Sequence, residues 1–427
     1  MKMQIKIIFL FIIIIQYGIA FSVGEKYVKL FEENKYSESI KILEDKIKEV
    51  YSSRVDNKKI PSGFITMKNI NSLVDLKKLF RKRKVKGFFI EENSKIADLH
   101  LYAARNYFQL SKFQHSLSHY IQCLRFKRIN DKSIGIIYYE IAQIMRKTEQ
   151  FSAYISSMIL AYSMDPLNPL YNYDLGLSLY NTKQRKRSIY HFEEYIKVSN
   201  KKIPEKVYLM VGNLNVDINR FLETVKYYKL YLKEKPDDYN IRFALGYICY
   251  KHTGDFKLAK ESFDEALKIM PETEIFKRSK SYEYKGDIAY NELDLDEAIK
   301  YYKKTIDYQD KINEQIESAR LEVKTLNDKI INLKIALLKN QNFAQYEEYE
   351  IKLDKKGKLE YKLQQIEGKF DRLNPGKSRW NIAVIHEKMK KYNEAIKYYR
   401  DVIKYNYKAT LARNKIIKLK LKIKRGY

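Results

Sequence analysis

Two histidines are the strongest candidates for chemistry in this sequence. His115 and His119 are four residues apart, which places both on one face of a helix. A metal site needs three or four ligands, and no Glu or Cys stands at a suitable spacing to complete one. The acidic pair Glu193-Glu194 fits the solvated face of an amphipathic helix. We therefore interpret the two histidines as part of the polar outer face of a helix.

The two cysteines suggest no chemistry either. Cys123 and Cys249 are separated by several of the repeats described below, whereas a disulfide needs Cα atoms within about 7 Å. Both fall on apolar helix faces, where cysteine behaves as a small hydrophobic residue. The sequence also lacks a Gly-x-Ser-x-Gly elbow, a P-loop, a Gly-rich dinucleotide turn and a Cys-x-x-Cys pair. These patterns predict a protein that is not an enzyme and binds no metal or cofactor.

The amino-terminal segment is typical of a secretory signal. Lys2 and Lys6 precede an apolar run over residues 7–15, and Gly18 and Ala20 form a small-x-small cleavage site. We expect residues 1–20 to be removed and the mature protein to be periplasmic or otherwise exported. The alternative is an uncleaved membrane anchor over residues 7–23, which is short for a bilayer that needs about 20 apolar residues.

The net charge of +29 has to be weighed against that export signal. A basic chain in the cytosol would suggest nucleic acid, but an exported protein meets anionic lipid, cell-wall polymer or acidic protein surfaces instead. We therefore expect no nucleic acid partner. Gly (14) and Pro (7) are scarce and hydrophobic residues make up 45% of the chain, which favours packed helices over turn-rich sheets.

One pattern recurs along most of the sequence. A bulky residue and a small residue are followed by an aromatic or Leu, then by Ala or Ser, then by a bulky residue four positions on. Most neighbouring repeat starts are 34 to 40 residues apart. The defining positions are Ala104, Ala142, Gly176, Gly212, Gly246, Gly286, Ala298, Tyr302, Ala395 and Tyr399.

This spacing suits two antiparallel helices, here called helix A and helix B. A small residue on helix A lets helix B approach, Ala298 and Ala395 fit the crossing point, and the aromatic four residues later fills the gap toward the next unit. Pro166, Pro236 and Pro271 follow helix B, because proline cannot continue a helix.

These residues resemble the tetratricopeptide repeat (TPR) family over residues 97–407, with one interruption. The resemblance implies an all-α fold, a right-handed superhelical TPR solenoid whose concave surface is lined by A helices. Carried onto this chain, the fifth and twelfth repeat positions predict partner-binding residues at Phe108, Tyr139, Tyr173, Tyr180, Phe243, Tyr250 and Tyr290. Tyrosine supplies large contact area with a hydrogen-bonding tip. The alternative is that some of these rings pack between neighbouring repeats.

The interruption carries a heptad. Apolar residues alternate at gaps of four and three from residue 312 to 337, and a second arm repeats this spacing from 359 to 373. The predicted seam is Ile312, Ile316, Ala319, Val323, Leu326, Ile330, Leu333 and Leu337, with Leu359, Leu363, Ile366, Phe370 and Leu373 opposite. We expect residues 309–373 to form an inserted antiparallel coiled-coil hairpin, a possible site of homo-oligomerisation. The alternative is a pair of extended repeat helices that stay within the array.

The remaining segments complete the predicted organisation. Residues 21–49 look like a degenerate repeat, and 50–94 are a linker with a basic run at 77–86, which either docks an anionic surface or is simply solvated. The array covers 95–308, and 374–427 hold the last repeat and a basic capping helix for which a membrane-surface role is the alternative.

The sequence thus predicts a non-catalytic scaffold that binds other proteins of the cell envelope. It is similar to periplasmic TPR proteins of spirochaetes, some of which build the collar around the periplasmic flagellar motor. A second hypothesis is a module that binds cell wall or anionic membrane through its basic segments. A third, an enzyme or cofactor of wall synthesis, finds no supporting residue.

Overall fold

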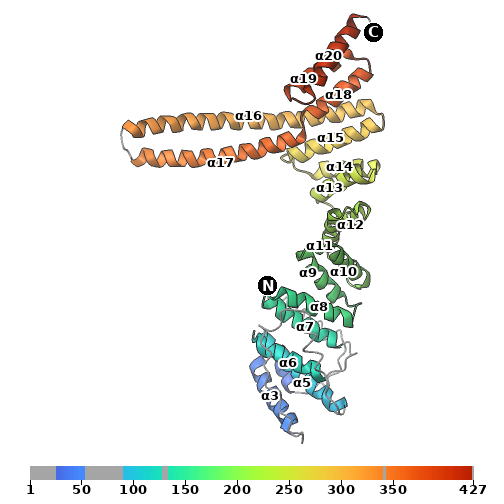
Figure 1. The fold of residues 1–427 in the computed structure, drawn as a ribbon, viewed down its shortest axis with the longest axis vertical. Helices are drawn as coiled ribbons and strands as arrows, with labels where there is room; N and C mark the ends of the chain where they lie inside the picture. The colour runs from blue at the N-terminus through green and yellow to red at the C-terminus, as the bar shows by residue number, and fades with distance from the viewer. Residues whose placement is uncertain (1–25, 53–89, 127–132, 340–342, 426–427) are drawn as a thin grey trace. The chain divides into compact units, whose positions relative to one another are not determined.

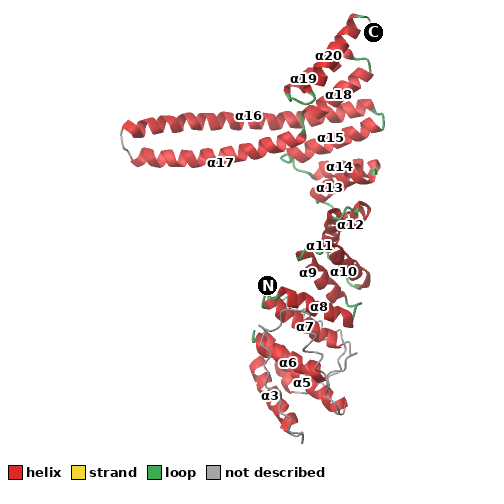
Figure 2. Cartoon of the chain, viewed as in Figure 1, coloured by secondary structure: helices red, strands yellow, loops and turns green. Residues whose placement is uncertain are grey.

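The computed structural model describes residues 26–52, 90–126, 133–339 and 343–425, and within these ranges the helices are joined by turns and loops and there is no strand (Figure 2). The all-α fold class is therefore confirmed. None of the helices in this part of the chain is both long and apolar enough to cross a membrane. The predicted signal segment and the basic run at 77–86 lie outside the described residues.

The chain divides into two compact units, Met1–Ile203 (unit 1) and Pro204–Tyr427 (unit 2), a boundary that the sequence analysis did not place. Unit 1 consists of successive antiparallel helix pairs. Its helices are α2 (Lys26–Glu32), α3 (Tyr36–Ser52), α5 (Ile90–Gln109), α6 (Phe113–Phe126), α7 (Ser133–Lys147), α8 (Phe151–Met164), α9 (Pro169–Asn181) and α10 (Arg185–Val198).

Unit 2 continues the pairs and adds the long arm (Figure 1). Its elements are α11 (Glu205–Asp217), α12 (Phe221–Glu234), α13 (Tyr239–Ile248), the π-helical turn η2 (Cys249–Thr253), α14 (Phe256–Ile269), α15 (Ile275–Asn291), α16 (Leu295–Lys339), α17 (Phe343–Leu373), α18 (Gly376–Lys388), α19 (Tyr392–Lys404) and α20 (Ala409–Lys424). The helices α8, α12 and α14 end before Pro166, Pro236 and Pro271, as predicted.

The small residue of helix A makes room for an aromatic ring of helix B. A Cβ added to Gly286 would lie 2.7 Å from the ring of Tyr302, and one added to Gly212 would lie 2.6 Å from the ring of Tyr228. Such distances are far inside van der Waals contact, so these positions require glycine. Tyr302 also packs with Ile382 of α18, and the ring therefore fills the gap toward the next pair as well.

A side chain–backbone hydrogen bond joins the helices of several pairs. The hydroxyl of Ser116 donates to the carbonyl of Ala104 at 2.7 Å, and that of Ser188 donates to the carbonyl of Gly176 at 2.8 Å. Ser39 makes the same bond to Tyr27 at 2.8 Å, again twelve residues apart. Residues 26–52 thus share the local geometry of the later pairs, although their sequence match is weak.

The A–B turns all use one residue in the left-handed backbone region. These residues are Asn34, Ser111, Glu149, Lys183, Asn219, Gly254, Leu293 and Lys390. Each turn residue usually stands seven positions after the small residue of helix A, but Gly254 stands eight after Gly246. The extra residue is absorbed in the π-helical turn η2, which keeps the ring of Phe263 against Gly246, so that a Cβ added to Gly246 would lie 2.8 Å from it.

The long arm is an antiparallel hairpin of α16 and α17 that projects from the helix pairs of unit 2 (Figure 1). The predicted seam residues are buried or half-buried along the whole of α16, which confirms the inserted hairpin. The alternative interpretation holds only for the first turns of α16, where Ala298 and Tyr302 serve as repeat positions of helix B. Because α16 is one unbroken helix of 45 residues, the arm is continuous with the repeat that carries it.

Candidate functional site

The A helices of unit 2 enclose a pocket of about 240 Å³. Helices α15 and α18 contribute most of its lining, while η2, which continues helix A from α13, and α16 contribute one ring each. The lining residues are Tyr250, Asp287, Tyr290, Asn291, Tyr302, Trp380, Asn381 and Val384. We call this set the tyrosine pocket. It combines aromatic rings with amide and carboxylate groups, a composition that is common in binding sites.

Asp287 organises the tyrosine pocket. Its carboxylate accepts hydrogen bonds from the hydroxyls of Tyr250 at 2.9 Å and Tyr302 at 2.7 Å. Burial, reinforced by the nearby carboxylate of Asp287, raises the pKa of both tyrosines well above the usual value. Both hydroxyls therefore stay protonated at neutral pH, and the carboxylate fixes the orientation of the two rings.

A lysine of α18 closes the network. The ammonium group of Lys377 lies 2.8 Å from Glu283 and 2.8 Å from Asp287. Burial opposes the charged form of Lys377, but the two carboxylates outweigh it and raise the pKa of the lysine. Lys280 adds a further ion pair to Glu283 at 2.8 Å. Because these charges are already paired, the pocket is better suited to neutral polar or aromatic groups than to an ion.

Tyr290 forms the rim of the pocket. Lys388 donates to its hydroxyl at 2.6 Å and lies 4.6 Å from its ring centroid. Trp380, which also lines the pocket, packs edge-on against Tyr399, with centroids 5.1 Å apart. Both contacts hold aromatic side chains in place before any partner arrives.

The seven predicted partner-binding residues fall into separate environments. Tyr250 and Tyr290 meet in the tyrosine pocket. Phe243 packs against Phe263 and Tyr284 inside unit 2, which matches the alternative of packing between repeats. In unit 1, the remaining residues are half-buried or exposed, and none of them reaches the pocket; these are Phe108, Tyr139, Tyr173 and Tyr180.

The unit 1 residues are held by local contacts. Tyr139 donates to Asp174 at 2.8 Å and lines a small cleft with Phe108. Tyr173 lies 5.2 Å from Tyr195, ring to ring, and Tyr180 is exposed. Whether any of these seven residues contacts a partner stays a prediction.

Sequence reasoning missed the polar half of the pocket. Asp287, Lys377 and Asn381 lie on A helices, but not at the fifth or twelfth positions that the family resemblance singled out. Asp287 directly follows the repeat-defining Gly286, so its place on the inner face was readable from the repeat register. Its bonds to Tyr302 and Lys377 join residues 15 and 90 positions away and need the fold.

The histidines require a correction. His119 does not lie on a polar outer face, because its Nδ1 lies 2.9 Å from Nδ1 of the buried His100 on the neighbouring helix. Burial lowers the pKa of His100 to about 3 and that of His119 to about 4, so both are neutral at pH 7. In the described part of the chain no group of three or more His, Cys, Asp or Glu could hold a metal ion. Cys123 and Cys249 are buried thiols.

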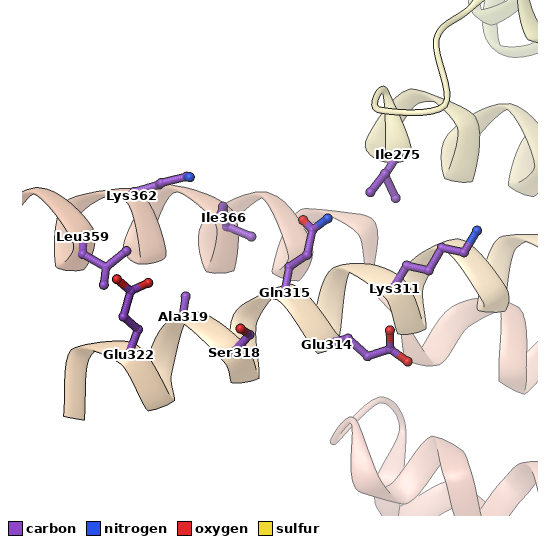
Figure 3. Close-up of a pocket in the computed structure, with 10 residues that line it drawn as sticks. All are labelled: Ile275, Lys311, Glu314, Gln315, Ser318, Ala319, Glu322, Leu359, Lys362 and Ile366. Carbon is purple, nitrogen blue, oxygen red and sulfur yellow. The ribbon is translucent and has the colours of Figure 1, made fainter. Parts of the chain in front are cut away.

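A second, more open cavity of about 640 Å³ lies at the base of the hairpin. Figure 3 shows its lining from both arms of the hairpin and from Ile275 at the start of α15. Glu314, Glu322 and Lys362 mix with small and apolar side chains there. The cavity is wide and its charges are of both signs, which gives it less definition than the tyrosine pocket.

Comparison with known proteins agrees with the helix-pair architecture. A tetratricopeptide repeat model matches residues 239–273 and 376–408. A TPR repeat-containing protein of Methanocaldococcus jannaschii is 26% identical over 198 residues, which cover 46% of this chain and 32% of that protein. The match thus spans about a third of the relative's length.

Solved TPR structures are also similar to parts of the chain. YrrB, described as a TPR protein with an unusual peptide-binding site, is 16% identical with a TM-score of 0.33 and covers 42% of this chain and 87% of its own. The C-terminal part of a TPR repeat-containing protein from Cytophaga hutchinsonii is 16% identical with a TM-score of 0.34. The match covers 66% of this chain and 93% of that structure. MamA is 19% identical with a TM-score of 0.31, and the match covers 41% of this chain and 97% of MamA.

The two segments that match the family model coincide with the pairs α13–α14 and α18–α19, and each segment supplies residues of the tyrosine pocket, Tyr250 from η2 in the first and Trp380, Asn381 and Val384 from α18 in the second. The pairs α9–α10, α11–α12 and α15–α16 show the same contact between a glycine of helix A and an aromatic ring of helix B. The chain thus contains tetratricopeptide repeats, which the family model matches over these two segments.

Proposed function

We propose that this protein is an exported, non-catalytic scaffold that holds an extended segment of another envelope protein in the tyrosine pocket. The observation that carries the proposal is the convergence of three A helices on one pocket whose tyrosines are fixed by Asp287. TPR proteins bind other proteins, and an open groove along stacked helices suits a polypeptide.

The chemistry of the pocket favours a peptide with neutral polar and aromatic side chains. The amides of Asn291 and Asn381 offer donors and acceptors to a peptide backbone. Tyr290 and Trp380 present aromatic surface to side chains. Rings that are already oriented lose little entropy on binding, which makes them good hot-spot residues.

The export and the complex are narrower parts of the same proposal. Lys2, Lys6, the apolar run at 7–15 and the Gly18–Ala20 site support a periplasmic location. A place in the collar of a spirochaete periplasmic flagellar motor is supported by compartment, repeat type and composition together. In that setting the protein would join envelope proteins into a larger assembly.

The proposal is tested by recovering partners from crosslinked cells with the tagged full chain. Tyr290→Ala combined with Asn381→Ala removes one aromatic rim and one amide, and we expect at least about a tenfold loss of recovered envelope protein. Tyr361→Ala is the matched control, because Tyr361 is a tyrosine on the exposed surface of the hairpin, away from the pocket. Equal recovery with the double variant, or no envelope protein at all, would contradict the proposal.

One observation favours a second candidate, binding to an anionic surface through α20. Residues 402–427 contain nine basic residues and no Asp or Glu. Ile417 and Leu421 are exposed one turn apart on the outside of this helix, an arrangement typical of interfacial helices. Sedimentation with anionic vesicles at rising salt tests it, since charge-driven binding falls with ionic strength. Binding that is absent at low salt excludes this candidate.

A further inference from the structure

The coiled-coil seam of the hairpin changes character toward its tip. Along α17 the 4-3 spacing continues before Leu359 through Gln345, Tyr349, Lys352 and Lys356, all half-buried. Counted outward from the turn, these positions face the apolar seam of α16 from Leu326 to Leu337. Lys356 donates to Asn327 at 2.8 Å, which confirms this register. Two lysines therefore occupy core positions near the tip.

Two interhelical ion pairs identify the two edges of the hairpin. Arg320 pairs with Glu367 at 2.6 Å on one edge, and Lys355 pairs with Glu322 at 3.2 Å on the other. Positions seven residues apart share an edge in a heptad. Leu353 and Tyr346 therefore lie on the edge of Glu367, two and three heptads along α17.

The face on the Arg320–Glu367 side is apolar near the tip. It consists of Ile331, Ile335, Leu338, Phe343, Tyr346 and Leu353, which we call the tip face. Leu338 is 81% exposed and Phe343 is 82% exposed, and the other four side chains are also exposed. The opposite face carries Lys329, Glu348 and Lys355, and among its described residues near the tip Ile351 is the one large apolar side chain that is exposed. A contiguous apolar patch of this kind marks an interaction surface.

The charges around the tip face limit what can cover it. The whole chain carries a net charge of +29, yet residues 328–354 hold five acidic and four basic residues. The tip is thus nearly neutral, and two tips can approach without the repulsion that the rest of the chain would impose. An anionic membrane, in contrast, would meet Glu347, Glu350 and Asp354 along the α17 side of this face.

The charges on the two sides of the tip face are of opposite sign, so two copies of this face can complement each other. The α16 side of the tip face carries Lys324 and Lys334, and the α17 side carries Glu347 and Glu350. Lys334 stands five residues before the end of α16 at Lys339, and Glu347 and Glu350 stand four and seven residues after the start of α17 at Phe343. A second hairpin that places its α17 against α16 would bring Glu347 and Glu350 to the level of Lys334.

We propose that the tip face binds the tip face of a second copy of this chain, around a two-fold axis parallel to the hairpin. The α16 helix of each copy then lies against α17 of the other, and the four helices form a short bundle. Leu338 meets Phe343 and Tyr346 of the second copy, and Ile331 meets Leu353. A two-fold axis perpendicular to the arm would instead place the acidic sides of both copies together, which like charges disfavour. This inference does not depend on the tyrosine pocket.

The test is the mass of the full chain in solution, measured by light scattering and by sedimentation equilibrium. Wild type should be a dimer at micromolar concentration. Leu338→Glu combined with Phe343→Glu should raise the dimer dissociation constant at least about a hundredfold, because both residues would be buried in the bundle. Circular dichroism should show the same helicity, since both side chains are solvent-exposed in the single chain.

Ile351→Glu is the matched control, since Ile351 is 62% exposed on the same helix but on the other face. It should leave the dimer intact. Exchanging the charges makes the test sharper. Lys334→Glu should raise the dimer dissociation constant, and adding Glu350→Lys to it should lower that constant again by about tenfold or more. A monomeric wild type, a double variant that dimerises normally, or equal dissociation by Ile351→Glu would overturn the proposal. So would a monomer whose tip binds vesicles and loses that binding in the double variant.

Discussion

The base and the tip of the hairpin share one continuous heptad repeat but differ in the residues that occupy its seam positions. At the base, Ile312, Ile316, Phe370 and Leu373 form a buried cluster between the arms. At the tip, lysines of α17 occupy the seam and the apolar residues lie on the outside. The base is also tied to the last repeat, because Arg379 of α18 reaches Gln309 at 3.0 Å and pairs with Asp310.

The difference shows that the position of apolar residues, not their number, decides the role of each part. The base buries its apolar side chains within one chain, so it fixes the arm to the repeats. The tip leaves them exposed, and Lys352 and Lys356 weaken its own seam. Pairing with a second tip would therefore bury this apolar surface. One heptad thus supports a rigid joint at one end and a binding surface at the other.

The largest expected effect comes from truncating a base residue. Phe370→Ala should lower the free energy of unfolding of unit 2 by about 3–4 kcal/mol, because it leaves a cavity among buried side chains. Leu338→Ala removes an exposed side chain. At protein concentrations below the dissociation constant of the dimer, it should change the free energy of unfolding by less than about 0.5 kcal/mol. Chemical denaturation of the two variants at low concentration measures both. Similar losses would erase the distinction between base and tip.

The joint between hairpin and last repeat should come next. Arg379→Ala leaves Gln309 buried without its partner and removes the ion pair to Asp310, and should cost about 3 kcal/mol in unit 2. Arg372→Ala, which removes an exposed arginine of α17, should cost less than about 0.5 kcal/mol. Denaturation curves report the stability, and hydrogen exchange shows whether the base opens. If Arg379→Ala costs no more than Arg372→Ala, the base is not held by this contact.

A change of pH should separate the hairpin from unit 1. His100 and His119 have folded-state pKa values lowered to about 3 and about 4, against about 6.5 when unfolded. Their contribution is present above pH 6.5 and is lost as pH falls toward the folded-state values, so unit 1 should lose about 2 kcal/mol for each residue between pH 7 and 5. Residues 309–373 contain no histidine, and the contrast between base and tip should persist. Hydrogen exchange of both regions at pH 7 and pH 5, corrected for intrinsic rates, measures this. Equal protection of α5 and α6 at the two values would contradict it.

The smallest effect should follow from repairing the tip seam. Lys352→Leu with Lys356→Leu places apolar side chains opposite Leu326 and Ile330 and should raise the opening free energy of the tip by about 1 kcal/mol. Lys358→Leu lies outside the seam and should leave it unchanged. Hydrogen exchange of the tip, at protein concentrations below the dissociation constant of the dimer, measures the opening free energy of both variants. No gain in the double variant would mean that the lysines do not weaken the seam.

Much of this architecture was predictable because apolar periodicity is a local signal. The repeat-defining glycines and alanines and the seam from Ile312 to Leu337 were read from spacing alone, and the structure places them as expected. The seam of α17 before Leu359 was not, because Lys352 and Lys356 carry the heptad spacing without its hydrophobicity.

The remaining features depend on contacts between distant residues or on small shifts of register. The His100–His119 contact and the Asp287–Lys377 pair join different helices, and no spacing rule connects them. The π-helical turn follows from one extra residue between Gly246 and Gly254, a difference of spacing that is visible only when the repeats are aligned residue by residue. Of the tyrosine pocket, Tyr250 and Tyr290 were predicted and the position of Asp287 was readable from the repeat register, but its contacts were not.

Hydrogen exchange of the full chain at two protein concentrations, one far below and one far above the dimer dissociation constant, tests the contrast most directly. The account predicts that peptides containing Ile312, Ile316 and Phe370 are equally protected at both concentrations. Peptides containing Leu338, Phe343 and Tyr346 should gain protection at the higher one. Tip protection that does not depend on concentration, or a base that exchanges as fast as the tip, would contradict it.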